Sequence, residues 1–185
     1  MRKNFGGKPF LYPMPVLIIA SYDENGVPNA MNAAWGCIAD VNRIGIYVAG
    51  NHKTTANILS RKAFTVSMAD AAHVVEADYV GIVSGSDVPD KLERAGLHTT
   101  KSEFVDAPVI DELPMALECR LVSFDEESEL MIGEIVNVCA DESVLTDGKI
   151  DPVKLNPITY DPVNHAYLTL GNKVGSAFSD GKKLI

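Results

Sequence analysis

The chain has little cysteine, and its cysteines show no pairing pattern. The three cysteines, Cys37, Cys119 and Cys139, lie far apart and form no Cys-x-x-Cys motif. This pattern fits buried thiols in a reducing compartment better than a disulfide framework. Cys37 follows Trp35 and Gly36 in an apolar stretch, which favours a buried structural thiol over a reactive one.

Motifs of several common enzyme classes are missing as well. No Gly-x-Gly-x-x-Gly follows a strand and opens a helix, so a Rossmann cofactor domain is not expected. No serine or cysteine lies in a Gly-x-Ser-x-Gly elbow. No cluster of His, Cys, Asp or Glu has the spacing of metal ligands, so we expect no metal site. The four histidines are scattered along the chain: His52, His73, His98 and His165.

Long apolar runs are also lacking. The run near the N-terminus covers only residues 16–20, and Pro13 and Pro15 precede it. A secretory signal needs about 7–15 consecutive apolar residues, and a membrane-spanning helix needs about 18. We therefore expect a soluble, cytoplasmic protein that does not enter a membrane.

The balance of charge is acidic, with 16 basic and 25 acidic residues and a formal net charge of −9. An acidic surface repels phosphate backbones, so nucleic acid is not the expected partner. A bound phosphate group would need a local basic pocket within this field. The length of 185 residues, with 46% apolar and 22% charged residues, predicts one globular domain over residues 1–185.

Short β-branched runs dominate the chain. We predict strands over residues 16–22, from about 27 to 35, 44–48, 64–68, around 117–121 and 130–139. Asn25-Gly26 between the first two is a strong hairpin signal. The alternation of apolar residues with Glu118 and Arg120 predicts one solvent-exposed face for the fifth strand, whereas the sixth strand is predicted to be more deeply buried. The acidic turn between them, residues 125–129, should be exposed.

Three short helices are predicted between these strands. One covers residues 53–62, one is capped by Asp70 and runs through Tyr79, and one covers residues 89–95 and ends at Gly96. Strands outnumber helices, and hairpin signals outnumber βαβ signals. The sequence therefore predicts a mainly β fold, a closed or half-closed antiparallel barrel with peripheral short helices.

Small side chains cluster in residues 29–35, within a predicted strand. They would let a flat ligand approach the backbone, whose polar groups can pair with the edge of a ring. The alternative is a tightly packed barrel corner with Trp35 in the core.

Two further segments could bind an anion. Residues 51–55 place a histidine, a lysine and two threonines at a predicted helix start, where free N–H groups and the helix dipole favour negative charge. A threonine-capped helix with a surface lysine explains the same residues. Residues 81–86 form a Ser/Gly turn before Lys91 that could add donors, although such a turn is often only a loop.

In this order, the three segments resemble the flavin reductase-like family of FMN-binding split barrels. The resemblance covers roughly residues 13 to 175, and its ordered set of stretches is more specific than any one of them. The matching stretches are residues 15–18, 25–35, 53–58, 64–67, 81–86, 90–97, 107–110, 117–119 and 133–136.

The resemblance implies a cofactor, FMN, and its contacts. The strand with Asn32, Ala33, Ala34 and Trp35 would lie along the isoalloxazine ring. The phosphate would be held by His52, Lys53, Thr54, Ser84 and Lys91. The C-terminal residues His165 and Tyr167 are further candidates for the pocket. Members of the family are generally homodimers with flavin near the subunit interface, so a homodimer is expected.

The resemblance also implies an oxidoreductase of the flavin or ferric reductase type, which takes up a hydride or electrons at bound flavin and passes them to an acceptor. Flavin reductases of this family usually carry a late Gly-Asp-His element, whereas this chain reads Ser128-Glu129-Leu130-Met131-Ile132-Gly133 there. The expected electron donor is therefore either NAD(P)H or a redox partner protein. The missing element favours the flavoredoxin-like branch, in which the protein is an electron carrier with tightly bound FMN and no NAD(P)H activity. A third interpretation is a non-catalytic split barrel that binds haem, with His52 or His165 as axial ligand, or that binds another small ligand.

Overall fold

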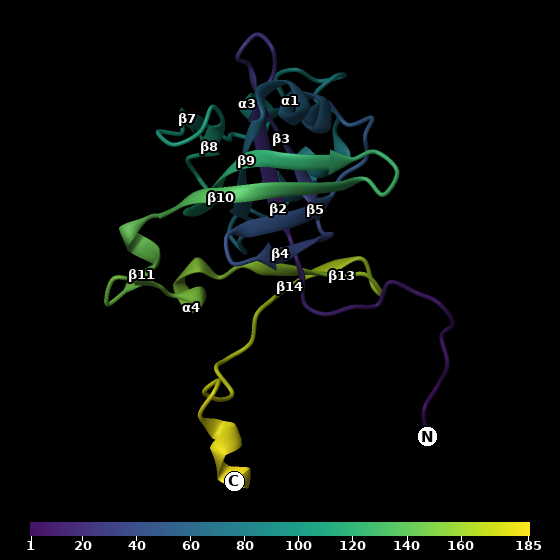
Figure 1. Cartoon of the computed structure of the whole chain (residues 1–185), viewed down its shortest axis with the longest axis vertical. Helices are drawn as coiled ribbons and strands as arrows, with labels where there is room; N and C mark the ends of the chain where they lie inside the picture. The colour runs from purple at the N-terminus through teal and green to yellow at the C-terminus, as the bar shows by residue number, and fades with distance from the viewer.

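The computed structural model describes residues 1–185. Its main element is a seven-stranded antiparallel sheet of order β3-β2-β6-β9-β10-β5-β4, which curls into a half-barrel (Figure 1). The strands are β2 (Leu17–Tyr22), β3 (Pro28–Ala33), β4 (Gly36–Asp40), β5 (Arg43–Tyr47), β6 (Ala63–Met68), β9 (Met115–Asp125) and β10 (Leu130–Ala140). This architecture confirms the mainly β, antiparallel barrel that the sequence predicts.

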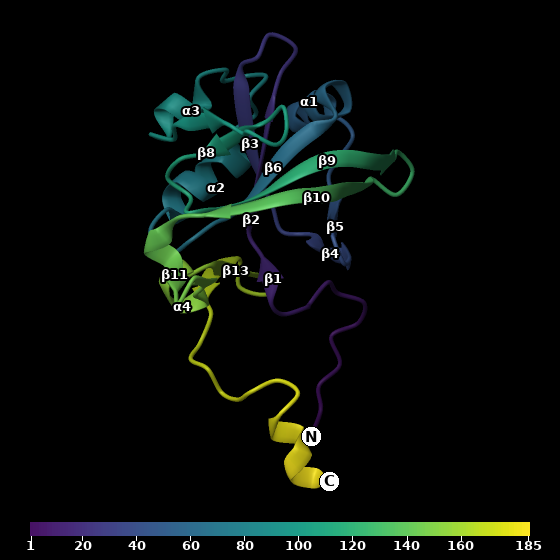
Figure 2. The same ribbon diagram turned by 60° about the vertical axis from the view of Figure 1, so that its left-hand side comes forward.

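Short helices and small sheets surround this half-barrel. The helices are α1 (Lys53–Arg61), α2 (Val74–Ile82), α3 (Lys91–Arg94) and α4 (Pro152–Leu155), with 3-10 turns at Glu142–Val144 and Asp180–Leu184. The small sheets join β1 (Met14–Pro15) to β13 (Ile158–Asp161) and β14 (Ala166–Thr169), β7 (Thr99–Lys101) to β8 (Pro108–Ile110), and β11 (Leu145–Thr146) to β12 (Lys149–Ile150). Figure 2 shows α1, α2 and α3 gathered around β2, β3 and β6.

The predicted hairpin is present, and an aspartate organises its turn. The Asp23 carboxylate accepts hydrogen bonds from the backbone N–H groups of Asn25 and Val27, both at 2.9 Å. Gly26 has a φ of +81°, which glycine adopts at no steric cost. The second strand ends at Ala33 rather than near residue 35, and the chain then enters β4, a strand that the sequence analysis did not predict.

The helix starts differ from the predicted ones. Asp70 does not cap α2, which begins only at Val74. Its carboxylate instead accepts hydrogen bonds from the N–H groups of Ala72 and His73, both at 2.9 Å, and so closes a turn before the helix. The third helix shrinks to α3, and Gly96 follows it with a φ of +68°.

The burial of β9 and β10 is the reverse of the prediction. Residues 116–119 of β9 are buried, whereas most of β10 is only half-buried. Glu118, expected on a wet face, is 3% exposed. The side-chain amide of Asn137 on β10 donates to its carboxylate, which satisfies the buried group.

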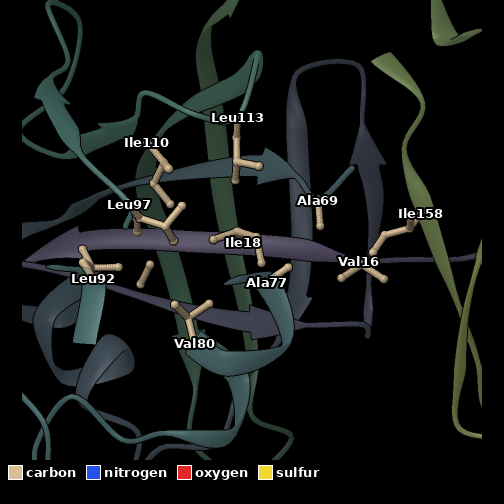
Figure 3. Close-up of a cluster of buried hydrophobic side chains, with 12 residues drawn as sticks. Val16, Ile18, Ala69, Ala77, Val80, Leu92, Leu97, Ile110, Leu113 and Ile158 are labelled. Atoms are coloured by element: carbon tan, nitrogen blue, oxygen red, sulfur yellow. The ribbon is translucent and has the colours of Figure 1, made fainter. Parts of the chain in front are cut away.

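The core has two parts, one on each face of β2. Ile18 packs with α2 and α3 residues in a cluster of 12 buried side chains (Figure 3). Ile19, on the opposite face, packs with Phe64 and Ile46 in a second cluster of 11. Side chains alternate between faces along a strand, so a strand that is buried on both sides is continuously apolar. This arrangement fixes β2 and its neighbour β3 as a rigid support for the site.

The cysteines are placed differently from one another. Cys119 is buried, Cys139 is half-buried and Cys37 is exposed. The prediction that Cys37 is a buried thiol is wrong because β4 is an edge strand whose outer residues nothing covers.

No helix of the structure combines the length and apolar character needed to cross a bilayer. No group of three or more His, Cys, Asp or Glu side chains is placed to hold a metal ion.

Candidate functional site

A cavity of about 350 Å³ lies between the start of α1, the end of α2 and strand β3. We call it the anion cavity. It is lined by Asn29, Met31, Asn51, His52, Lys53, Thr54, Val80, Gly81, Ile82, Val83, Ser84, Gly85 and Lys91. None of these residues carries a carboxylate, although the chain as a whole has a net charge of −9. The cavity is therefore a local basic pocket of the kind that a phosphate requires.

The first turn of α1 presents donors to this cavity. No backbone carbonyl accepts from the N–H groups of residues 53–55, the N-cap residue His52 makes no side-chain cap, and the first turn holds no acidic residue. Such a helix start carries a partial positive charge and favours an anion. The Thr54 hydroxyl accepts a hydrogen bond from the Asn29 side-chain nitrogen at 2.7 Å. Its own hydrogen is therefore free to donate.

Lys91 places a buried cation beside the same cavity. The residue is 3% exposed, and its Nζ donates to the carbonyl oxygens of Val80 at 3.1 Å and Val83 at 2.9 Å, at the end of α2. No carboxylate pairs with it. Burial, followed by the nearby charge of Lys53, lowers the pKa of Lys91 to about 8. A bound anion would stabilise the charged form, because an opposite charge offsets the cost of desolvation.

Lys53 reaches the cavity from the other side. Its Nζ lies 3.6 Å from the Asp23 carboxylate and 3.4 Å from the carbonyl oxygen of Gly85. A Cβ on Gly85 would come within 2.1 Å of the Asn29 Oδ1 atom and 3.3 Å of Lys53 Cδ. Only glycine therefore lets the turn at residues 84–86 pack this closely against β3 and α1.

One buried polar atom at the cavity has no partner in the protein. Asn29 is 3% exposed, and its side-chain oxygen makes no hydrogen bond. Buried polar atoms are nearly always hydrogen-bonded, so this oxygen is available to accept a hydrogen bond from a water or from a donor on a bound group. With two lysines, a free helix start and a hydroxyl, the donor set fits a phosphate monoester.

A second cavity, of about 260 Å³, adjoins the first and shares Gly81 and Ile82 with it. We call it the aromatic cavity. Its other lining residues are Val16, Asn32, Ala34, Trp35, Asp78, Tyr160 and Tyr167. The Asn32 side-chain nitrogen donates to the carbonyl oxygen of Ala77 at 3.0 Å. A Cβ on Gly81 would lie 2.8 Å from the Asn32 Cβ, so this glycine keeps α2 close to β3.

A tyrosine from the C-terminal sheet closes one side of the aromatic cavity. The Tyr167 hydroxyl donates to the Asp78 carboxylate at 2.7 Å. Burial and the hydrogen bond to Asp78 raise the pKa of Tyr167 to about 12. Its ring lies 6.2 Å from that of Tyr160, whose hydroxyl is 2.9 Å from His165 Nδ1. This cavity thus offers apolar and aromatic walls with a few polar groups, as sites for flat ring systems do.

The structure brings most of the predicted site residues together in these two cavities. His52, Lys53, Thr54, Ser84 and Lys91 line the anion cavity, and Asn32, Ala34 and Trp35 line the aromatic cavity. Ala33 lines neither, because it points to the opposite face of β3 and packs against the core cluster around Ile19. Tyr167 lines the aromatic cavity, whereas His165 contacts it only through Tyr160.

Several lining residues were missed. Asn29 and Asn51 lie within segments that the sequence singles out, and the position of Asn51 just before the predicted helix start was the available signal. Asp78 and Tyr160 carry no such signal. They reach the aromatic cavity only because α2 and the C-terminal sheet fold against β3.

Comparisons with known proteins agree with this geometry. A family model described as "Flavin reductase like domain" matches residues 10–162. Flavoredoxin of Desulfovibrio vulgaris (Miyazaki F) is 38% identical, with a TM-score of 0.94 over 98% of this chain and 100% of that chain. Flavoredoxin from Methanosarcina acetivorans is 29% identical, with a TM-score of 0.90 over 100% of both chains. The uncharacterized protein YddH of Escherichia coli (strain K12) is 30% identical over 169 residues, 86% of this chain and 88% of that protein.

Proposed function

Because the chain belongs to the flavin reductase-like domain family, we propose that it binds FMN and acts as a flavin-dependent redox protein. It would take up a hydride or electrons at the bound flavin and pass them to an acceptor. The observation that carries this proposal is the anion cavity, a carboxylate-free pocket with two lysines in an acidic chain.

The chain's own residues would divide the work of holding the cofactor. Lys53, Lys91 and the first-turn N–H groups of α1 would hold the phosphate, and Thr54 and Ser84 would add hydroxyl donors. The walls of the aromatic cavity would orient the ring and keep water from part of it. When bound, the flavin supplies the hydride and one-electron chemistry. A site of this kind needs no acid–base triad of its own.

A fluorescence titration with FMN tests the phosphate assignment. Lys91→Met and Lys53→Met each remove a charge-assisted hydrogen bond, which contributes about 1.5–3 kcal/mol, so each should weaken FMN binding by about 10- to 150-fold. Lys149→Met, at a lysine outside both cavities, is the matched control and should bind as the wild type does. Unchanged affinity in both cavity variants would refute the assignment. A haem-type absorption band in the purified protein, without flavin bands, would refute the cofactor.

The electron donor divides this proposal into two candidates. A reductase would accept a hydride from NAD(P)H, whereas a carrier would receive electrons from a redox partner protein. The 38% identity to a flavoredoxin and the sequence Ser128–Gly133, which lacks a Gly-Asp-His element, favour the carrier. Anaerobic mixing of the FMN-loaded protein with NADH and with NADPH separates them. Persistence of the flavin absorbance supports the carrier, and rapid bleaching supports the reductase.

A further inference from the structure

The two neighbouring cavities carry charge of opposite sign. The anion cavity is lined by Lys53 and Lys91 and by no carboxylate. The aromatic cavity is lined by one carboxylate, that of Asp78, and by no lysine, arginine or histidine. The two cavities share Gly81 and Ile82, so a ligand that occupies both would meet positive charge at one end and negative charge at the other. The lysines suit a phosphate, whereas the binding of a neutral ring does not require the carboxylate.

No cation of the chain pairs with Asp78. No salt bridge of the structure includes its carboxylate, and the hydrogen bond that it accepts comes from the uncharged hydroxyl of Tyr167 at 2.7 Å. Because the pKa of Tyr167 is raised to about 12, this hydroxyl keeps its proton and donates it to the hydrogen bond at neutral pH. The negative charge of Asp78 therefore faces the aromatic cavity without a neutralising partner.

The fold holds this carboxylate in position. Its neighbours on α2, Ala77 and Val80, are 3% and 1% exposed and pack in the larger core cluster (Figure 3). The carbonyl oxygen of Ala77 also accepts a hydrogen bond from the Asn32 side chain at 3.0 Å, which ties α2 to β3. Asp78 itself is half-buried and is tied to β14 through Tyr167. Moving the carboxylate away from the cavity would break that last bond.

We propose that Asp78 lowers the reduction potential of the flavin bound here, because its charge favours the oxidised ring over the reduced one. This inference rests on the proposed function, in which the aromatic cavity holds the ring. A flavin that takes up two electrons and one proton gains one negative charge, and a like charge held nearby opposes that gain. Charge near the ring is one of the means by which a protein tunes a flavin.

A lowered potential has a consequence for the partners of the protein. The reduced flavin gives up its electrons more readily, and the oxidised flavin accepts electrons less readily. The site would therefore require a strongly reducing donor, and it could reduce acceptors that free reduced FMN reduces less completely. Asp78 would act in this way through its charge alone, without transferring a proton or forming a bond.

The affinity of the protein for the two oxidation states of FMN tests this role. Equilibrium dialysis of each full-length protein under argon measures the dissociation constant of oxidised FMN and, with excess dithionite as the source of electrons, that of reduced FMN. The quantity compared between proteins is the ratio of the reduced to the oxidised constant. In Asp78→Asn we expect this ratio to fall by about tenfold, which corresponds to a rise of about 30 mV in the potential of a two-electron couple.

Three further variants separate charge from structure. Asp78→Ala removes the same charge together with the acceptor for Tyr167, so it should lower the ratio as much as Asp78→Asn does. Asp78→Glu keeps the charge and should keep the wild-type ratio. Glu76→Gln removes a carboxylate from the same helix outside both cavities and should leave the ratio unchanged. Thermal unfolding of each variant shows whether it is folded.

The possible outcomes distinguish this role from the proposed function. A wild-type ratio in Asp78→Asn, or an equal fall in Glu76→Gln, would overturn the role of Asp78 while FMN binding stands. A fall in Asp78→Ala alone would also overturn it, because the lost hydrogen bond from Tyr167 would then be the cause. A wild type that binds neither oxidation state would refute the proposed function and, with it, this inference.

Discussion

The anion cavity and the exposed edge of the large sheet differ in how completely one chain builds them. The anion cavity is closed by fixed groups from β3, α1, α2 and α3, and its buried lysine is already held by two carbonyl oxygens. The edge of the large sheet at β4 and β5 leaves Trp35 and Tyr47 more than half exposed. A single chain thus completes the anion cavity but leaves the neighbouring aromatic surface uncovered.

The largest effect is expected from a methyl group in the anion cavity. In Gly85→Ala the new Cβ would lie 2.1 Å from Asn29 Oδ1, so the turn and the Lys53 side chain must move. Overpacking of this kind costs about 1–3 kcal/mol, and with Lys53 displaced we expect FMN affinity to fall by about 50-fold or more. Gly50→Ala is the control, because its Cβ would meet only Phe124 at 3.9 Å. Equal FMN affinity in both variants would show that the cavity does not need its close packing.

The pH dependence of FMN binding should report on Lys91. Its pKa is lowered to about 8, below the ordinary 10.5, so the free protein loses this charge as the pH rises through 8. Binding of an anion above that pH requires uptake of a proton, and affinity should fall by up to about tenfold per pH unit between pH 8 and 9.5. Lys91→Met should remove this slope. A slope of equal size in the variant would assign the titration to another group.

The thiols should differ in reactivity. Cys37 is exposed on the edge strand β4, whereas Cys119 is buried and its pKa is raised to about 12. In a Cys139→Ser background we expect ready alkylation of Cys37 and no alkylation of Cys119 until the protein is unfolded. Equal rates for the two thiols in the folded protein would contradict the position of β4 at the sheet edge.

The smallest effect is expected at the wall of the aromatic cavity. Tyr167→Phe removes the hydrogen bond to Asp78 that ties β14 to α2. The free energy of unfolding should fall by about 1 kcal/mol, which corresponds to about 2–4 °C in Tm for a chain of this size. Tyr160→Phe, whose partner His165 is exposed, should change Tm less. A larger loss in Tyr160→Phe would reverse the roles assigned to the two tyrosines.

Local signals predicted the parts of this molecule that depend on neighbours in the sequence. The hairpin at Asn25-Gly26 and the left-handed glycine at residue 96, just after α3, follow from turn and capping chemistry. The anion cavity could be predicted in outline, because a helix start with Lys53 and Thr54 favours negative charge through its local dipole and donors. The pairing of that start with Lys91 came from the resemblance to a family, since spacing alone does not bring α3 to α1.

The remaining features depend on tertiary structure and left no local signal. Strand β4 was not predicted because the small residues around Gly36 give no strand pattern. Its position at the edge of the sheet exposes Cys37. The alternation of Glu118 with apolar residues is typical of a surface position, but in the fold Glu118 is buried and accepts a hydrogen bond from Asn137 on the neighbouring strand β10. Asp78 and Tyr167 meet only when the C-terminal sheet packs on α2. The exposure of the apolar residues Val174 and Phe178 could not be predicted from the sequence, because exposure is a property of the folded chain.

A comparison of FMN with riboflavin tests the central claim most directly, because the two ligands differ only in the phosphate. Fluorescence titrations would measure the affinity of both for the wild type and for Lys91→Met. We predict that the wild type prefers FMN strongly, and that the variant loses about 10- to 150-fold in FMN affinity while its riboflavin affinity stays unchanged. Equal binding of both ligands by the wild type, or equal losses for both in the variant, would contradict the placement of the phosphate in the anion cavity.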